Sequence, residues 1–147
     1  MGNLTFTVGE ALEYASKGLI EDWVHLFLNS VGDNIPFSEG LKLQKRYWLG
    51  PVFMELDYLK RCCGPEPEMK FVVPAEGWED HITYFQRLIR DEWDMPPLIG
   101  ENESDYLIVN DGNHRLEAMK REGIEKCWVI IWESNSAENL QLWSKYL

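Results

Sequence analysis

The feature that most constrains the fold is a strand-like run, a glycine turn, a helical pattern and a second strand-like run, all within residues 106–133. "YLIVN" leads into the turn "DGN", "HRLEAMKRE" has helical spacing, and "KCWVIIWE" is the strongest strand pattern in the chain. Gly123 stands where a glycine commonly follows the end of a helix. Such a unit buries its apolar faces only in a layered structure, so the sequence predicts a sheet with helices packed on it.

The residues around this unit extend the same alternation. "MKFVVP" is typical of a short strand, and residues 78–93 carry apolar side chains at helical spacing. "PPLIGE" is expected to be extended because its two prolines disfavour a helix. "SAENLQLWSKYL" predicts a last helix. We therefore predict that residues 68–147 form one compact α+β unit, a small mixed β-sheet with helices at about 78–93 and 113–122 packed on it.

Residues 1–67 are interpreted as a helical N-terminal extension. Thr7 and Glu10 have the spacing of a capping box, and Gly18 can end the helix that they begin. "EDWVHLFLNSVG" repeats the amphipathic pattern, and "VFMELDYLKR" at residues 52–61 also looks helical. The sequence "GPEPE" then breaks the pattern before the α+β unit begins.

Charge restricts the class of partner. Asp and Glu outnumber Lys and Arg by 25 to 14, which gives a net charge of −11. Proteins that bind DNA draw most of their affinity from neutralising phosphates, and no run of Lys or Arg forms a basic stripe here. We expect no direct DNA binding, whereas a small phosphorylated molecule needs only one local positive site.

Cysteine usage and hydropathy point to the cytoplasm. Cys62, Cys63 and Cys127 are odd in number and lack metal-ligand spacing, which favours reduced thiols. No secretory signal precedes them. The longest apolar run, "CWVIIW", is too short to span a bilayer. We expect a cytoplasmic protein with no membrane anchor, and the sequence leaves a protein partner open.

The turn from Asp111 to Arg115 has the composition of an anion site. The first amides of a helix lack internal partners and carry partial positive charge. Gly112 permits a positive φ, and Asn113 can cap the helix with its side chain. His114 and Arg115 would add two donors, while Asp111 would hold a metal ion or orient Arg115. A solvated turn with ordinary polar residues is the competing interpretation.

The segment "IVNDGNHRLEAMKREGIEKCWVIIW" resembles the phosphate loop of the ParB/sulfiredoxin superfamily, and "RDEWDMPPLIG" resembles the segment before it. The resemblance covers roughly residues 69–132, and residues 1–67 match nothing in it. It implies that Gly112, Asn113, His114 and Arg115 bind a nucleotide, either ATP or ADP, or CTP, together with Mg²⁺.

The branches of that superfamily differ in what the loop does. Sulfiredoxins carry a cysteine where this chain has Asn113, so the resemblance implies no sulfinic-acid reductase activity. ParB proteins bind CTP and attach a helix-turn-helix domain, which we do not expect because the chain ends about fifteen residues after its last predicted strand. Free serine kinases use ADP or ATP with a similar loop, and this chain resembles that branch most.

The leading hypothesis is a nucleotide-binding protein, either a small-molecule kinase or a nucleotide phosphohydrolase, with Asp111, His114 and Arg115 as catalytic candidates. The general base is unassigned, and Asp111, Glu92 and Asp94 are candidates. The alternative is a non-catalytic regulatory or interaction module with a degenerate nucleotide pocket. A ParB-like nuclease ranks last because the sequence shows no basic track for nucleic acid.

Overall fold

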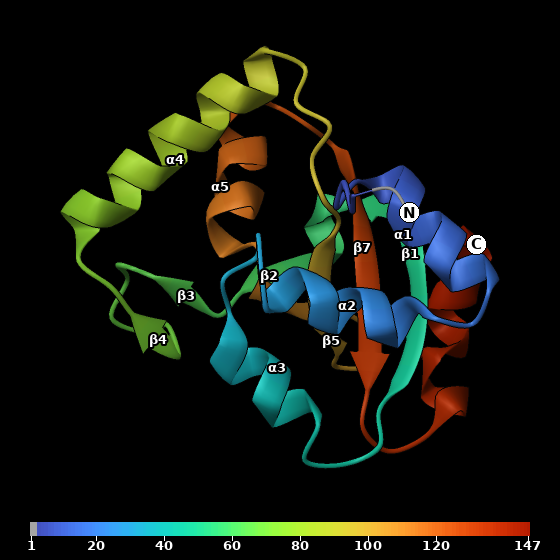
Figure 1. The fold of residues 1–147 in the computed structure, drawn as a ribbon. Helices are drawn as coiled ribbons and strands as arrows, with labels where there is room; N and C mark the ends of the chain where they lie inside the picture. Colours follow the sequence, from blue (N-terminus) through green and yellow to red (C-terminus); the bar gives the residue numbers. More distant parts are fainter. Residues whose placement is uncertain (1–2) are drawn as a thin grey trace.

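The protein is described by a computed structural model that covers residues 3–147 and contains a mixed five-stranded sheet with helices on both faces (Figure 1). The strands lie in the order β1-β7-β5-β6-β2. Their bounds are β1 (Tyr47–Glu55), β2 (Leu59–Arg61), β5 (Leu98–Asn102), β6 (Leu107–Asp111) and β7 (Lys126–Glu133). β5 pairs with β6 antiparallel and with β7 parallel, and β1 pairs with β7 antiparallel. The predicted α+β class with a mixed sheet is confirmed.

The remaining elements are five α-helices, two 3₁₀ segments and a small two-stranded sheet. They are α1 (Val8–Ser16), α2 (Ile20–Leu28), α3 (Ile35–Leu41), α4 (Ala75–Arg90), α5 (Asn113–Arg121), η1 (Leu56–Tyr58), η2 (Ala137–Tyr146), β3 (Cys63–Gly64) and β4 (Phe71–Val72). The C-terminal segment η2 forms 3₁₀ turns, whereas its sequence predicts a helix without specifying the type. Within residues 3–147, no helix combines the length and the apolar composition needed to cross a bilayer.

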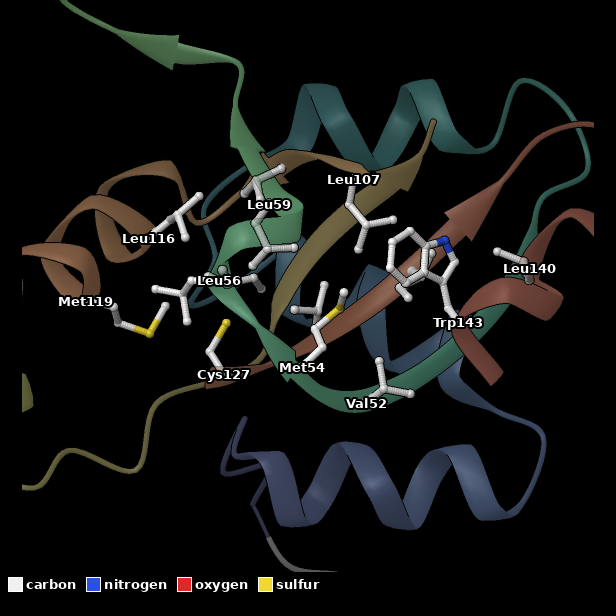
Figure 2. Packing of buried hydrophobic residues seen from close by; sticks show 14 residues of the cluster. Val52, Met54, Leu56, Leu59, Leu107, Leu116, Met119, Cys127, Leu140 and Trp143 are labelled. Carbon is white, nitrogen blue, oxygen red and sulfur yellow. The ribbon is translucent and has the colours of Figure 1, made fainter. Parts of the chain in front are cut away.

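Two hydrophobic cores lie on opposite faces of the sheet. Successive side chains of a strand point to opposite faces, so Val129 and Ile131 of β7 lie in one core, and Ile130 and Trp132 lie in the other. Figure 2 shows the first core, where α5 and η2 cover the sheet with Leu116, Met119, Leu140 and Trp143. Helices α1, α2 and α3 cover the second core with Ala11, Trp23, Val24, Phe27, Leu28 and Leu41. The N-terminal helices are thus part of the layered structure.

Helix α4 forms an outer layer over α5 (Figure 1). Trp78 and Ile82 of α4 pack on Ala118 of α5, and Arg121 of α5 contacts Glu79 of α4 at 2.6 Å. We predicted that both helices pack on the sheet. α5 does so, whereas α4 packs mainly on α5, and this places the aromatic side chains of α4 beside the start of α5.

The helical prediction for residues 52–61 is wrong. Residues 47–55 form β1 and residues 59–61 form β2, so the predicted boundary at residue 67 falls after two strands of the main sheet. From Val52 the burial alternates, with exposures of 0% for Val52, 43% for Phe53 and 0% for Met54. That period of two is typical of a strand with one buried face.

The Thr7 cap of α1 is confirmed, whereas the Glu10 carboxylate binds the amides before Thr7 and not that of Thr7 itself. Thr7 Oγ1 accepts a hydrogen bond from the Glu10 amide at 3.3 Å, and the Glu10 carboxylate accepts one from the Phe6 amide at 3.0 Å. The same carboxylate accepts the Trp23 indole N–H at 2.9 Å, which ties α1 to α2. The pKa of Glu10 is lowered: burial opposes the change, but these donors outweigh it.

Candidate functional site

The site is built around the junction of β6 and α5. β6 ends at Asp111, and Gly112 has a φ of +105° before α5 begins at Asn113. The Leu116 amide donates to the Gly112 carbonyl at 2.8 Å. The amides of residues 113–115 precede that bond, where a helix has no internal acceptors to offer. The predicted strand–turn–helix junction and the positive φ at Gly112 are confirmed.

A cavity of about 730 Å³ opens beside this junction. Gly112, Asn113 and His114 line it on the side of α5. Other lining residues include aromatic rings, cations, acids and an amide, among them Phe37, Trp132, Arg46, Lys70, Asp33, Glu101 and Asn34. A volume of this size lies within the range of cofactor and substrate pockets. The cavity therefore offers a helix N-terminus, positive charge and aromatic surface in one space.

Residues 32–41, which include α3, supply one wall of this cavity. Asn34, between α2 and α3, donates a hydrogen bond to Asp111 at 3.3 Å. Phe37 of α3 lies with its ring 6.1 Å from the Trp132 ring, and the Arg46 guanidinium lies 5.0 Å above that indole. No local pattern identifies these residues, because only the packing of α2 and α3 on the sheet brings them to the turn.

Asp111 and Arg115 form a buried ion pair. The Arg115 Nη2 donates to the Asp111 carboxylate at 3.1 Å, and Nη1 donates to the Pro96 carbonyl at 2.6 Å. Burial raises the pKa of the Asp111 carboxyl, and the adjacent guanidinium opposes that rise. Arg115 lines a smaller neighbouring cavity and is not part of the lining of the larger one. Its contact with phosphate stays a prediction, and its partners in the structure hold the turn to the segment before β5.

Asn113 does not cap α5, which corrects the predicted role of its side chain. Its Oδ1 accepts from the amides of Cys62 and Cys63 at 2.9 and 3.3 Å, and its Nδ2 donates to the Val109 carbonyl at 3.1 Å. These bonds satisfy backbone groups of the segment after β2 and of β6. The N-cap position of α5 belongs to Gly112. The hydrogen bonds of Asn113 instead join the start of α5 to the segment after β2, and both line the cavity.

Cys62 and Cys63 line the larger cavity. Cys62 Sγ donates to the Val109 carbonyl at 3.0 Å. Burial raises the pKa of both thiols. The thiolate is the nucleophilic form, so the raised pKa favours neutral, less reactive thiols in the cavity wall.

His114 lies among aromatic rings of α4 and lines both cavities. Its ring centroid is 4.6 Å from that of Trp78 and 4.8 Å from that of His81. Burial, followed by the charge of His81, lowers the pKa of His114 to about 4. The imidazole is therefore neutral near pH 7, and it can both donate and accept a hydrogen bond.

We expect His114 to make stability depend on pH below its ordinary pKa of 6.5. The unfolded chain binds a proton at His114 between pH 6.5 and about 4, whereas the folded chain does not, so stability is lost as the pH falls through this window. The melting temperature of the wild type should drop more between pH 7 and 4 than that of His114→Gln. Equal slopes for the two proteins would contradict the neutral, buried assignment.

The sequence names Glu92 and Asp94 among the candidate bases, and the structure adds Glu101. Glu92 and Asp94, after α4, line neither cavity, whereas Glu101 of β5 lines the larger one. Burial, then the charge of Glu103, raises the pKa of Glu101. Within residues 3–147, no group of three His, Cys, Asp or Glu side chains has the arrangement of a metal site. Glu101 was missed because a single glutamate at a strand end carries no motif.

Comparison with known proteins gives structural likeness only. No family model and no curated protein matches the chain. The structure of sulfiredoxin from Arabidopsis thaliana is 19% identical over 62% of this chain and 92% of its own, with a TM-score of 0.44. ParB from Caulobacter crescentus, complexed with CTP-γ-S, is 18% identical over 64% of this chain and 50% of its own, with a TM-score of 0.44.

A free serine kinase in complex with AMP is 16% identical over 60% of this chain, with a TM-score of 0.40. This chain spans 32% of that kinase and 32% of a conserved hypothetical protein from Pyrococcus furiosus that is 17% identical to it. Among these proteins are a sulfiredoxin, a ParB protein and a free serine kinase, the three types of protein compared in the sequence analysis. The likeness is partial in every case, so activity and ligand have to be argued from the site itself.

Proposed function

We propose that the protein binds a nucleotide in the larger cavity, with its phosphates at the start of α5. The supporting observation is that the cavity of about 730 Å³ joins the Gly112–His114 backbone to Lys70 and to the rings of Phe37 and Trp132. Helix N-termini favour phosphate oxygens, a cation adds charge-assisted contacts, and aromatic faces suit a base. The net charge of −11 does not oppose this, because the positive potential needed is local.

Mg²⁺ would accompany the nucleotide if the protein catalyses phosphoryl transfer. Asp33 lines the cavity and is the carboxylate that would hold the ion, because Asp111 is already paired with Arg115 and Glu101 is kept as the candidate base. The ion would neutralise charge on the phosphates. Glu101 replaces Glu92 and Asp94 as the candidate base, since it alone of the three lines this cavity.

Calorimetric titration with ATP, ADP, CTP and GTP, each with and without Mg²⁺, tests the proposal. Saturable binding of one nucleotide together with release of phosphate or transfer to an acceptor supports an enzyme. Binding without turnover supports the regulatory module. That second function is favoured by one observation: the carboxylate nearest the turn, Asp111, is occupied by Arg115 and Asn34. Failure of all four nucleotides to bind would refute both.

Lys70 gives a direct test of the phosphate site. Its side chain is exposed and lines the cavity, so Lys70→Ala should lower nucleotide affinity about tenfold, as expected for loss of a hydrogen bond to a charged group. Lys17→Ala is the matched control, because it changes the net charge equally at an exposed position, paired with Glu13, that lines neither cavity. Equal losses in the two variants would mean that only overall charge matters.

A further inference from the structure

A second cavity of about 340 Å³ lies on the other side of the turn. It shares Gly32, Asp111, Gly112 and His114 with the larger cavity. Its own walls come from the end of α2, from α4 and from the residues after α4, and they are apolar or aromatic: Phe27, Val31, Tyr84, Phe85, Leu88 and Trp93. None of these six side chains lines the larger cavity, so the two spaces differ in chemistry.

The walls present apolar surface to an open space. Phe85 and Trp93 are stacked, with centroids 5.6 Å apart and planes 15° from parallel, and together they form a rigid aromatic side. Val31 and Tyr84 keep 68% and 54% of their surface exposed. Covering such surface is favourable, and aromatic ligands gain most from stacked and edge contacts with rings. The body of a matching ligand is therefore aromatic.

The polar end of this cavity carries no unpaired charge. Its two ionised groups, Asp111 and Arg115, neutralise one another at 3.1 Å. Within residues 3–147 the His114 ring takes part in no hydrogen bond and its nitrogens are not among the fully buried atoms, so they are available to a ligand. A carboxylate or ammonium group placed here would lose its hydration without gaining a free counter-ion, whereas a hydroxyl or N–H group would gain a hydrogen bond.

We propose that this second cavity is a binding site for an uncharged aromatic small molecule that carries a hydroxyl or N–H group, with the polar group directed at His114. The site goes beyond the nucleotide proposal, because its walls on α4 take no part in the larger cavity. The two sites adjoin at Gly32 and at the turn residues Asp111, Gly112 and His114, and their remaining lining residues differ.

Titration of the isotope-labelled protein with indole, phenol and benzoate, followed by ¹H–¹⁵N spectra, tests the site. Indole and phenol should give saturable shifts at α4, Trp93 and residues 112–115. Benzoate, which is charged and has no hydroxyl donor, should bind about tenfold more weakly or worse. Absence of saturable shifts with indole and phenol, or preferred binding of benzoate, would overturn the proposal.

A filling variant separates the site from surface adsorption. Val31→Trp places a large ring at an exposed wall position and should abolish the indole and phenol shifts. Leu142→Trp, at a 48% exposed position that lines neither cavity, is the control and should leave them unchanged. Melting temperatures of both variants are measured to confirm folding. Shifts that persist in a folded Val31→Trp protein would reject the site, and retained nucleotide binding in that variant would keep the two proposals distinct.

Discussion

Arg115→Ala should lower the free energy of unfolding by about 3–5 kcal/mol, the range expected when one partner of a buried ion pair is removed. The side chain is 7% exposed, and its loss would leave the Asp111 carboxylate buried without its cation. The Pro96 carbonyl would also lose its donor at 2.6 Å. Urea denaturation of wild type and variant, fitted with a common slope, measures the difference.

The control for this experiment is Arg90→Ala. Arg90 also forms an ion pair, with Glu122, but its side chain is 66% exposed, so its removal should change stability far less. The double variant Asp111→Ala with Arg115→Ala should recover part of the loss, because the uncompensated carboxylate is then absent. If Arg115→Ala were as mild as Arg90→Ala while abolishing nucleotide binding, the guanidinium would belong to the phosphate site and not to the scaffold.

Local chemistry made the turn predictable. A positive φ at Gly112 follows from the need for a tight strand-to-helix turn. Gly123, with a φ of +74°, adopts the left-handed conformation that commonly ends a helix, and α5 ends just before it. Each of these features depends on residues within a few positions. The sequence therefore predicted the position of β6, the turn and α5 well.

Long-range contacts decided what the sequence could not show. The oxygen of Asn113 bonds to the amide of Cys62, 51 residues away, and this bond outcompetes a local helix cap. β1 was missed because Gly50 and Pro51 interrupt its pattern, and its pairing with β7 shifts register between Leu49 and Val52. The direction of the Arg115 side chain depends on the Pro96 carbonyl, which no motif contains.

Gly112→Val should combine a loss of stability of about 2–5 kcal/mol with loss of nucleotide binding. A side chain at φ +105° is strained, and the new Cβ would collide with Leu98 and lie 2.9 Å from Arg115 Nη2. Relief of that collision moves the turn or the buried ion pair, and either movement displaces the first amides of α5. Thermal and urea unfolding, with nucleotide titration of the folded fraction, measure both effects.

Gly77→Ala is the matched glycine control for this prediction, because an added Cβ there meets nothing within 4 Å and its φ is not positive. Within α4 that change should stabilise the protein by about 0.5–1 kcal/mol, since alanine loses less conformational freedom than glycine in a helix. Opposite signs at the two positions would show that Gly112 is required for its backbone geometry. If valine at position 112 were tolerated with unchanged nucleotide affinity, the phosphate site could not depend on the conformation of this turn.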